Sequence, residues 1–332
     1  MNGENLRVGV LGATGLVGRA MVACLERSSL EFKDVRLWAT ERGAGSTMPF
    51  RGAALAVEAW SAGAHRHVDA LLLATKGDVS RGVAPEAAAD GTLVIDNSSA
   101  FRMDPDVPLV VPEVNPAALS ENRGIIANPN CSTIQLVAVL APLHEAARLA
   151  RVVVATYQSV SGVGREGLMA LEREESGEDP GPSPFAAPIH RNVVPQCDAF
   201  LEDGWTREEW KLQVETRKIL ELPRLDVAAT CVRVPVAVSH GEAVTADFHE
   251  ALSPGDARAR LAASGVHVED DPSVSLYPTP AAVEGRDGVF VGRIRGRPES
   301  PRTVHLWIVA DNLLKGAAAN AVDILECMVF HG

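Results

Sequence analysis

A glycine-rich turn directly after an apolar strand places the strongest constraint on the fold. Residues 6–11 form a short strand that is apolar apart from Arg7, Gly12-Ala-Thr-Gly15-Leu-Val-Gly18 follows at once, and a helical pattern covers about residues 19–27. Strand, glycine turn and helix in this order let backbone N–H groups approach a pyrophosphate. The spacing is GxxGxxG rather than GxGxxG, but its position between these elements favours a dinucleotide-binding loop over an ordinary tight turn.

The alternation of strands and helices continues to about residue 130. We expect strands over residues 35–39, 68–75 and 92–96, with a helix over about residues 79–89. This order is typical of a doubly wound, Rossmann-type α/β domain, in which ligands bind at the carboxyl ends of the strands. Thr75 and Asn97 lie at such ends, and Arg102 follows in a polar loop suited to an anion, although a lone arginine is more often a surface charge.

The loop after the second strand bears on which nicotinamide cofactor the chain prefers. An NAD-binding unit places an acidic residue here to hold the ribose 2′-hydroxyl. This chain has Thr40-Glu41-Arg42-Gly43. Arg42 and the Thr40 hydroxyl would suit a 2′-phosphate and favour NADP, whereas Glu41 facing the ribose would favour NAD.

Cys131 lies at a predicted helix start. The apolar residues 124–127 meet the turn Asn128-Pro129-Asn130, and a helical pattern covers residues 132–147. The positive end of a helix dipole favours a thiolate, which is a nucleophile. A small buried hydrophobe that caps a core helix is the alternative, and for this position alone both interpretations stand.

The second half has long strands and fewer helices, which indicates an α+β domain with a mixed sheet. We expect a strand over residues 151–158, a small-residue turn over residues 159–167, an exposed loop over residues 172–188, and a helix over residues 210–220. One strand-like stretch covers residues 227–240, with Pro235 at an edge or bulge. A long amphipathic helix follows over residues 313–329.

The predicted domains are residues 1–130, completed by residues 312–332, and residues 131–311. The first would bind NADP, and the second would carry catalysis and dimerisation.

Composition excludes several classes of protein. The 332 residues carry a net charge of −12 without a basic cluster, so we expect no nucleic-acid partner. The sequence contains no run of about 18 apolar residues, so we expect no membrane span. Five scattered cysteines without CxxC spacing, after an N-terminus without a signal-peptide pattern, favour reduced thiols and a cytoplasmic protein. No metal-ligand spacing is evident, and we interpret His65 and His67 as surface residues.

Taken together, the motifs resemble those of the aspartate-semialdehyde dehydrogenase family. They are GATGLVG (12–18), SSAFR (98–102), NPNCSTIQ (128–135), QSVSGVG (158–164), ETRKIL (215–220), VRVPV (232–236) with His240, and DNLLKGAAANA (311–321). The resemblance implies reduction of L-aspartyl-4-phosphate by NADPH to aspartate 4-semialdehyde and phosphate, in the biosynthesis of lysine, threonine and methionine. It also implies a homodimer built through the second domain.

The resemblance implies a role for each matching residue. Cys131 would be the nucleophile, His240 the acid/base, and Gln158 would orient the thioester. Arg233 would bind the substrate carboxylate and Glu215 its amino group. The phosphate site would comprise Arg102, Lys218 and Asn130. The resemblance and the sequence pattern together imply a cofactor site. Its residues are Gly12, Thr14, Gly15, Leu16, Val17, Thr40, Arg42, Gly43, Thr75, Asn97, Ser161, Gly162 and Asn312.

One departure and two alternatives stay open. The family usually has Gly-His-Ser around its catalytic histidine, whereas this chain has Ser239-His240-Gly241. An enzyme acting on N-acetyl-glutamyl phosphate is one alternative, which Glu215 disfavours because an acetylated amine carries no charge. A catalytically silent, NADP-binding relative is the other, and an i,i+3 pair such as Glu215 and Lys218 is usually only a solvated charge pair.

Overall fold

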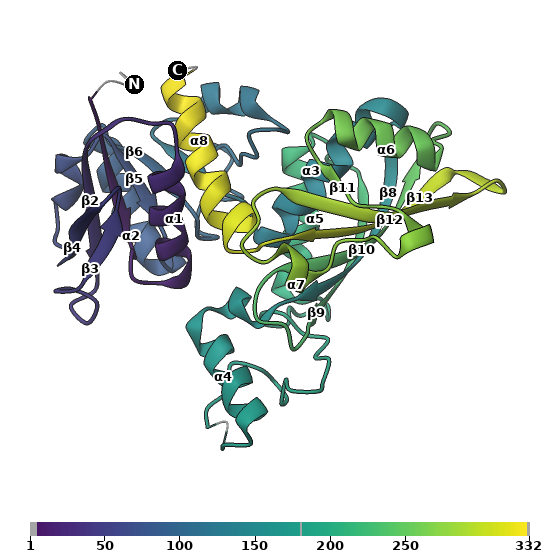
Figure 1. Ribbon diagram of the computed structural model, residues 1–332. Coiled ribbons are helices and arrows are strands. Elements are labelled where there is room, and N and C mark those ends of the chain that lie inside the picture. Colours follow the sequence, from purple (N-terminus) through teal and green to yellow (C-terminus); the bar gives the residue numbers. More distant parts are fainter. Residues whose placement is uncertain (1–4, 180, 331–332) are drawn as a thin grey trace. The chain divides into compact units, whose positions relative to one another are not determined.

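The computed structural model describes residues 5–179 and 181–330, and these form two compact units. Unit 1 comprises residues up to 130 together with those from 317 onward, and unit 2 comprises residues 131–316 (Figure 1). Residues 1–4 and 331–332, at the ends of the predicted first domain, lie outside the described residues. Residues 312–316, which we assigned to the first domain, group with unit 2 because Asn312 bonds to Ser159, Ser161 and Ser239 there.

Unit 1 is a Rossmann-type domain around a seven-stranded sheet of order β3-β4-β2-β1-β5-β6-β7. All its pairs are parallel except β3–β4. The strands are β1 (Leu6–Leu11), β2 (Phe32–Ala39), β3 (Thr47–Phe50), β4 (Ala53–Ala59), β5 (Ala70–Leu73), β6 (Leu93–Asp96) and β7 (Ile125–Ala127). The helices are α1 (Leu16–Arg27), α2 (Gly77–Ala89) and α8 (Ala319–Phe330), with short 3₁₀ turns at Ala64–His67 and Pro116–Glu121.

The chain order of unit 1 creates a topological switch at β1. The chain passes from β1 to β2 on one side and later returns to β5 on the other side of β1. Helices on either side of such a switch diverge and leave room for a ligand beyond the strand ends. Gly12 directly follows β1 and Ala74 directly follows β5, so the glycine turn lies at this position.

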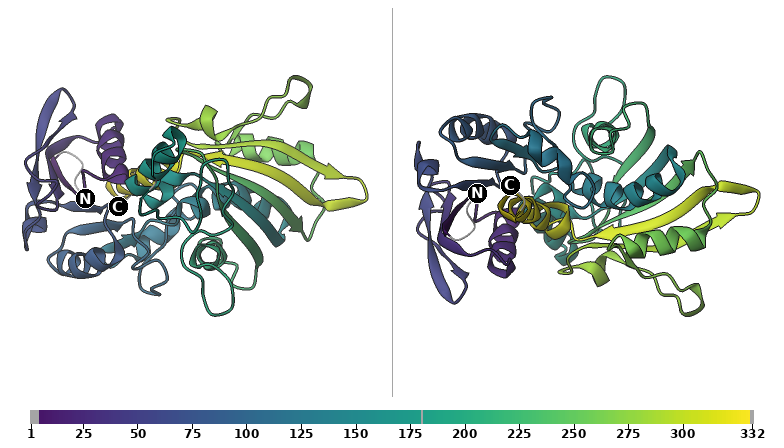
Figure 2. Two further views of the ribbon diagram at one scale, coloured as in Figure 1. Left: turned by 90° about the horizontal axis from the view of Figure 1, so that it is seen from below. Right: turned by 90° about the horizontal axis from the view of Figure 1, so that it is seen from above.

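Unit 2 is built on a six-stranded mixed sheet of order β11-β12-β13-β10-β8-β9. Only β8–β9 and β11–β12 pair in parallel. The strands are β8 (Leu149–Gln158), β9 (Asp226–Arg233), β10 (His240–Phe248), β11 (His267–Val268), β12 (Val289–Arg297) and β13 (Ser300–Ala310). Figure 2 shows the β12–β13 hairpin projecting from one end of the sheet.

Helices cover one face of this sheet. They are α3 (Cys131–Ala147), α5 (Arg207–Ile219) and α6 (Pro254–Ala263), with α4 (Arg165–Ser176) and α7 (Pro280–Val283) elsewhere in the unit. Short turns lie at Val160–Val163 and Pro272–Val274, and a π-helical turn at Leu314–Ala318. Along β8 the side chains alternate, with Val152 and Val154 buried in the core and Val153 and Tyr157 exposed. The second face therefore presents apolar side chains.

Several sequence predictions about elements were incomplete. Strands β3, β4 and β12 were not expected, because β3 and β4 are short and half-exposed and β12 is rich in arginine and glycine. The predicted 172–188 loop begins inside α4, which continues to Ser176. The strand-like stretch 227–240 is a strand only as far as Arg233, where β9 ends, because the chain leaves the sheet around Pro235 and pairs again from His240, the first residue of β10.

The prediction for His65 was wrong. Its side chain is 1 % exposed and its Nε2 lies 2.8 Å from Asp90 Oδ2. Asp90 also pairs with Arg66, so the carboxylate is shared between two partners. Glu86 lies close enough to complete a set of possible metal ligands, but these existing pairs account for the arrangement without an ion.

None of the helices in the described parts of the chain has the length and hydrophobicity that a membrane-spanning helix needs.

Candidate active site

The glycine turn of unit 1 is shaped for close backbone approach. Gly12 has φ +88°, and a Cβ there would collide with the Ala74 carbonyl oxygen, while a Cβ on Gly18 would collide with the Gly12 carbonyl oxygen. Gly15 is exposed and precedes α1, whose first turn has no side-chain cap and no acidic residue. Leu16 and Val17 begin α1, so their amides belong to its N-terminal turn. This arrangement suits a pyrophosphate.

The loop after β2 touches the glycine turn. A Cβ at Gly43 would lie 2.8 Å from Thr14 Oγ1, so the two loops are in contact within unit 1. Thr40 closes the turn by accepting the amide of Gly43 at 2.8 Å. Glu41 and Arg42 are both exposed and form no ion pair within the described residues. The loop therefore lies where a ribose would be expected, and both side chains are available to it.

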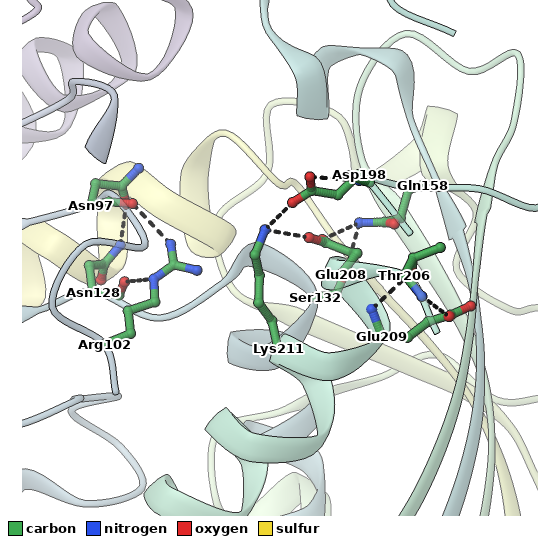
Figure 3. A network of polar contacts seen from close by, with 11 residues as sticks. Asn97, Arg102, Asn128, Ser132, Gln158, Asp198, Thr206, Glu208, Glu209 and Lys211 are labelled. Atoms are coloured by element: carbon green, nitrogen blue, oxygen red, sulfur yellow. Dashed lines mark hydrogen bonds and ion pairs between the residues drawn. The ribbon is translucent and has the colours of Figure 1, made fainter. Parts of the chain in front are cut away.

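Polar side chains gather at the ends of β5, β6 and β7. Thr75 Oγ1 bonds to Ser80, which donates to Asp96 at 2.7 Å. Arg102 is buried, and its Nε and Nη2 donate to the carbonyl oxygens of Asn128 and Asn97, each at 2.9 Å (Figure 3). The asparagine amides also bond to each other. Unit 1 thus fixes the guanidinium of Arg102 from two strand ends.

Asn130 is the last residue of the first segment of unit 1, and Cys131, the next residue in the chain, is the first of unit 2. Asn130 is buried. Cys131 is the first residue of α3, one position earlier than we expected from the sequence, and its side chain is partly exposed. Gly316 packs against it, since a Cβ there would lie 2.9 Å from Cys131 Cβ. The thiol therefore lies at the positive end of a 17-residue helix, which favours the thiolate.

The sheet register of unit 2 brings three predicted residues into one row. Gln158 ends β8 and pairs with Arg233, the last residue of β9. On the other side Tyr157 pairs with Gly241, and the same register places His240, the first residue of β10, beside Gln158. All three side chains are buried. Gln158 and His240, which are 82 positions apart in the chain, are thereby adjacent where β8 ends and β10 begins.

Gln158 connects this row to α3 and α5. Its Nε2 donates to Ser132 Oγ and to Glu208 Oε1, each at 3.0 Å (Figure 3). Ser132 follows Cys131 directly, so this bond links the row to the start of α3. The Gln158 Oε1 atom is buried and has no hydrogen-bond partner among the described residues. It is available to a ligand.

A backbone carbonyl group fixes the guanidinium of Arg233. Its Nη1 donates to the Ser159 carbonyl oxygen at 2.7 Å. A Cβ at Gly162 would lie 2.6 Å from that same Nη1 and 3.4 Å from His240 Nε2. A glycine at position 162 therefore keeps space open beside both side chains.

His240 is completely buried and oriented through Nδ1. Ser159 donates its backbone N–H to Nδ1 at 3.0 Å, and Ser159 Oγ lies 3.1 Å from the same atom. Nε2 has no hydrogen-bond partner in the described part of the chain. Burial, followed by the nearby charge of Arg233, lowers the pKa of His240 to about 3. The resting imidazole is therefore neutral near pH 7.

Glu208 and Lys211 were missed from the sequence. Both lie in the first turns of α5, and Lys211 Nζ donates to Glu208 Oε2 at 3.1 Å and to Asp198 at 2.8 Å. Glu208 contacts Gln158 and acts electrostatically on His240. The predicted pair, Glu215 and Lys218, has the same spacing but lies seven residues further on, about 10 Å along the helix.

Ser161 and Asn312 form a buried polar cluster with Ser159. Asn312 Oδ1 accepts from Ser159 Oγ at 3.0 Å and from the Ser239 amide at 2.8 Å, and its Nδ2 donates to Ser161 Oγ at 3.0 Å. These hydrogen bonds use much of the hydrogen-bonding capacity of Ser161 and Asn312, the two predicted cofactor ligands in this cluster. They position the loop that precedes His240.

The sequence was compared with those of known proteins. Residues 7–122 match the family described as semialdehyde dehydrogenase, NAD binding domain, and residues 140–315 match the semialdehyde dehydrogenase dimerisation domain. Aspartate-semialdehyde dehydrogenase of Aquifex aeolicus is 45 % identical over 98 % of each chain, and so is that of Bacillus subtilis. The chain belongs to the aspartate-semialdehyde dehydrogenase family.

Solved structures of the family have the same fold. Aspartate-semialdehyde dehydrogenase II of Vibrio cholerae, complexed with ASA, superimposes with a TM-score of 0.95 at 39 % identity, covering 98 % of this chain and 99 % of that one. The Candida albicans family member with NADP gives a TM-score of 0.75 at 28 % identity, covering 97 % and 98 %. The resemblance inferred from the motifs and the predicted fold class are confirmed.

Proposed function

We propose that the protein is an NADPH-dependent aspartate-semialdehyde dehydrogenase that reduces L-aspartyl-4-phosphate through a Cys131 thioester. The observation that carries this proposal is the buried row of Gln158, Arg233 and His240, joined through Gln158 to Ser132 beside the thiol. A nucleophile, an acid/base and a carboxylate-binding guanidinium thus come from three separate elements of unit 2, namely α3, β10 and β9. The reaction needs each of them.

In the first step the Cys131 thiolate attacks the acyl-phosphate carbon. The C–S bond forms, the carbon–oxygen bond to phosphate breaks, and phosphate leaves. Backbone N–H groups at the start of α3 are suited to stabilise the negative charge that develops on the acyl oxygen. Gln158, whose Oε1 has no hydrogen-bond partner among the described residues, orients the thioester.

A bound NADPH supplies the hydride that reduces the thioester carbon. His240 Nε2, beside the open space at Gly162, gives a proton to the resulting oxygen and takes it back in the reverse reaction. The hemithioacetal then collapses to aldehyde and Cys131 thiolate.

For two substrate contacts we propose residues other than those predicted from the sequence. Arg233 keeps its role as the carboxylate ligand, since its planar fork is fixed by the Ser159 carbonyl. Glu208 replaces Glu215 as the partner of the substrate ammonium, because Glu208 reaches Gln158. Lys211 correspondingly replaces Lys218 as a phosphate ligand.

Arg102 and Asn130 keep the phosphate role that the family resemblance implies. The Asn97 and Asn128 carbonyls hold the Arg102 guanidinium in a fixed orientation, which suits recognition of an anion.

NADP is the proposed cofactor. The glycine turn fits a pyrophosphate, because Gly12, Gly15 and Gly18 carry no side chain and so allow a close approach to the backbone. Arg42, exposed and next in the chain to Gly43, which lies beside Thr14, is suited to a 2′-phosphate. Ser161, Gly162 and Asn312 remain proposed cofactor residues. Thr75 and Asn97 remain in the set as residues at the carboxyl ends of β5 and β6.

We also propose a homodimer formed through the open face of the unit 2 sheet and a cytoplasmic location. The dimer rests on the family description of residues 140–315 and on the exposed apolar residues of β8. The location rests on five free, scattered cysteines and on the biosynthetic reaction.

The test is phosphate-dependent reduction of NADP with L-aspartate 4-semialdehyde, with NAD and N-acetylglutamate semialdehyde assayed in parallel. We expect activity that requires phosphate, prefers NADP and is lost in Cys131→Ala while NADP still binds. A preference for the acetylated aldehyde would transfer the assignment to the N-acetyl-glutamyl phosphate reaction. Folded protein that binds NADP but reduces it with neither aldehyde would identify a silent relative.

A further inference from the structure

The π-helical turn Leu314–Ala318, which follows β13, packs against the residue that carries the thiol. Its Gly316 lies so close to Cys131 that an added Cβ would meet Cys131 Cβ at 2.9 Å and Cys131 Cα at 3.3 Å. Both residues belong to unit 2. The backbone of Gly316 therefore contacts the thiol-bearing residue directly, and the position of the turn decides how much room that residue has.

Asp311, which directly follows β13, fixes this turn. Its Oδ1 accepts the backbone N–H groups of Leu313 and Leu314 at 2.8 and 3.1 Å, and its Oδ2 accepts that of Gly285 at 2.8 Å. Its carbonyl oxygen accepts the Gly316 N–H at 3.0 Å, which is the i→i+5 hydrogen bond of a π-helix. Asp311 is buried. One buried residue thus joins the start of the turn to Gly316 and to the segment that follows α7.

We propose that Asp311 is a positioning residue for Cys131: its carboxylate fixes the π-helical turn and thereby sets the position of Gly316 against the thiol-bearing residue. The proposal deepens the proposed function and rests on it, because Cys131 is the proposed nucleophile.

The geometry of the turn explains why it needs such an anchor. A π-helical turn is rare, usually a single turn long, and frequent at functional sites. Its first N–H groups have no partners within the turn, and the Asp311 carboxylate accepts two of them. Without this carboxylate the turn would be free to tighten towards α-helical geometry, and that change would move Gly316 relative to Cys131.

The position of the thiol matters because attack on the acyl carbon depends steeply on distance. Reacting atoms must lie about 3–3.5 Å apart, and a misplacement of about 1 Å can lower the rate about a hundredfold. Substrate binding through Arg233 uses β9, a separate element. A displaced turn should therefore lower kcat more than it raises KM.

Asn312, the next residue, connects the same end of β13 to the proposed acid/base. Its Oδ1 accepts the backbone N–H of Ser239 at 2.8 Å, one residue before His240. A substitution at Asp311 could thus act on His240 through Asn312 rather than on Cys131. The experiment needs a measurement that reports on the thiol alone.

The first test compares Asp311→Asn with the wild-type chain. The amide keeps the shape of the side chain, but its NH₂ group faces N–H donors on one side, so one anchor of the turn is lost. We expect iodoacetamide to alkylate Cys131 about threefold faster or more, measured by mass spectrometry of its peptide, because the loosened turn exposes the thiol. In the phosphorylating oxidation of aspartate 4-semialdehyde, kcat should fall roughly tenfold or more, with KM changed less than about threefold.

Gly316→Ala is the second variant, because it adds one methyl group beside Cys131 and leaves the Asp311 carboxylate in place. It should also lower kcat, but it should slow the alkylation of Cys131, since the methyl group fills the space beside that residue. Alkylation rates that change in opposite directions, while kcat falls in both variants, distinguish a change of position from a general loss of stability.

Asp271→Asn is the matched control. Asp271 caps another turn of unit 2, Pro272–Val274, by accepting the Ser273 N–H at 2.9 Å. Its replacement should leave kcat and the alkylation of Cys131 at their wild-type values.

Three results would overturn the proposal. Folded Asp311→Asn protein with wild-type kcat and alkylation would leave Asp311 a purely structural role, visible only as a lower midpoint of urea unfolding. A lower kcat with unchanged alkylation would assign the effect to Asn312 and His240. A Gly316→Ala enzyme with wild-type kcat and alkylation would show that the position of the turn does not matter to Cys131.

Alkylation also separates this proposal from the proposed function. If the wild-type protein has no dehydrogenase activity but the alkylation rates of both variants change as expected, the proposed function fails while the positioning role of Asp311 stands.

Discussion

Ser239 directly precedes the proposed acid/base in a backbone conformation that serine rarely adopts. Its φ is +74°, its side chain is fully buried, and its Oγ has no hydrogen-bond partner among the described residues. The family usually has glycine here, which enters the left-handed region without strain. The glycine of this chain is instead at position 241, where a Cβ would lie 2.5 Å from the Trp307 ring. Packing against Trp307 therefore accounts for the glycine at position 241, whereas the serine at position 239 has no structural explanation.

We predict that Ser239→Gly stabilises the protein. The variant removes left-handed strain and an unsatisfied buried hydroxyl, and we expect the free energy of unfolding to rise by about 1 kcal/mol. The midpoint of urea unfolding measures this. Ser275→Gly is the control, because Ser275 has φ +54° but is exposed and its hydroxyl faces water. Equal gains in both variants would show that the buried hydroxyl costs nothing.

At the scale of a single element, β10 carries two buried titratable groups whose contributions to stability change with pH in opposite directions. Burial lowers the pKa of His240 to about 3, and burial raises the pKa of Glu242 well above its usual value, with Gln135 offsetting part of that rise. His240 is neutral in the folded state but protonates in the unfolded chain below about pH 6.5, so its contribution to stability is lost as pH falls from 6.5 towards 3. Glu242 keeps its proton when folded, so its contribution falls as pH rises above 4.5.

Between pH 4.5 and 6.5 the two contributions therefore oppose each other, which gives a prediction for two variants. Each group alone changes the free energy of unfolding by up to about 1.4 kcal/mol per pH unit. Relative to wild type, Glu242→Gln should lose stability on acidification through this window, and His240→Asn should gain it. Urea titrations of the three proteins at several pH values measure the differences. Parallel curves for all three would show that neither group is buried in its predicted protonation state.

Helix α5 carries two Glu–Lys pairs of identical spacing, and only one belongs to the proposed site. We predict that Glu208→Gln raises KM for aspartate 4-semialdehyde roughly tenfold to a hundredfold, because a carboxylate that pairs with the substrate ammonium is lost. Glu215→Gln is the matched control and should change KM less than about threefold. Steady-state kinetics at saturating NADP and phosphate decide between them. A larger effect at position 215 would restore the assignment made from the sequence.

These two pairs show where sequence reasoning succeeded and where it stopped. The cysteine at a helix start follows from local chemistry, namely an apolar strand, a proline turn and an apolar helix. Periodicity does not distinguish Glu208 from Glu215, since both lie on one face of the same helix. A local signal for the helix start did exist: Thr206 and Glu209 form a capping box, which places Glu208 in the first turn of α5.

Tertiary pairing accounts for the other omissions. The row of Gln158, Arg233 and His240 depends on the register between strands far apart in sequence, which no local pattern specifies. Strands β3 and β4 consist largely of alanine and half-exposed residues, so their strand character comes from pairing with each other and with β2.

At the scale of the whole molecule, the open face of the unit 2 sheet is the surface that association would cover. On the outward side of β8, where Ala155 lies between them, Val153 is 37 % exposed and Tyr157 is 39 % exposed, and Tyr157 packs against Trp307. Large apolar side chains that share one exposed sheet face are typical of subunit interfaces.

We predict that Val153→Asp converts the dimer to a monomer, because association would bury an unpaired charge. Val274→Asp is the matched control: Val274 is 70 % exposed, in a 3₁₀ turn outside the strands of the sheet, and its replacement should leave the dimer intact. Light scattering coupled to size-exclusion chromatography gives the mass of each variant. A dimeric Val153→Asp protein would exclude this face as the interface.

Unit 1 is discontinuous in sequence, and this sets an order on its assembly during translation. Helix α8, which packs against α1 and β6, is made only after all of unit 2 has been synthesised. Unit 2 is continuous, so every one of its contacts is available to the nascent chain before α8 leaves the ribosome. The nucleotide-binding half, although it is synthesised first, is thus the last to be completed.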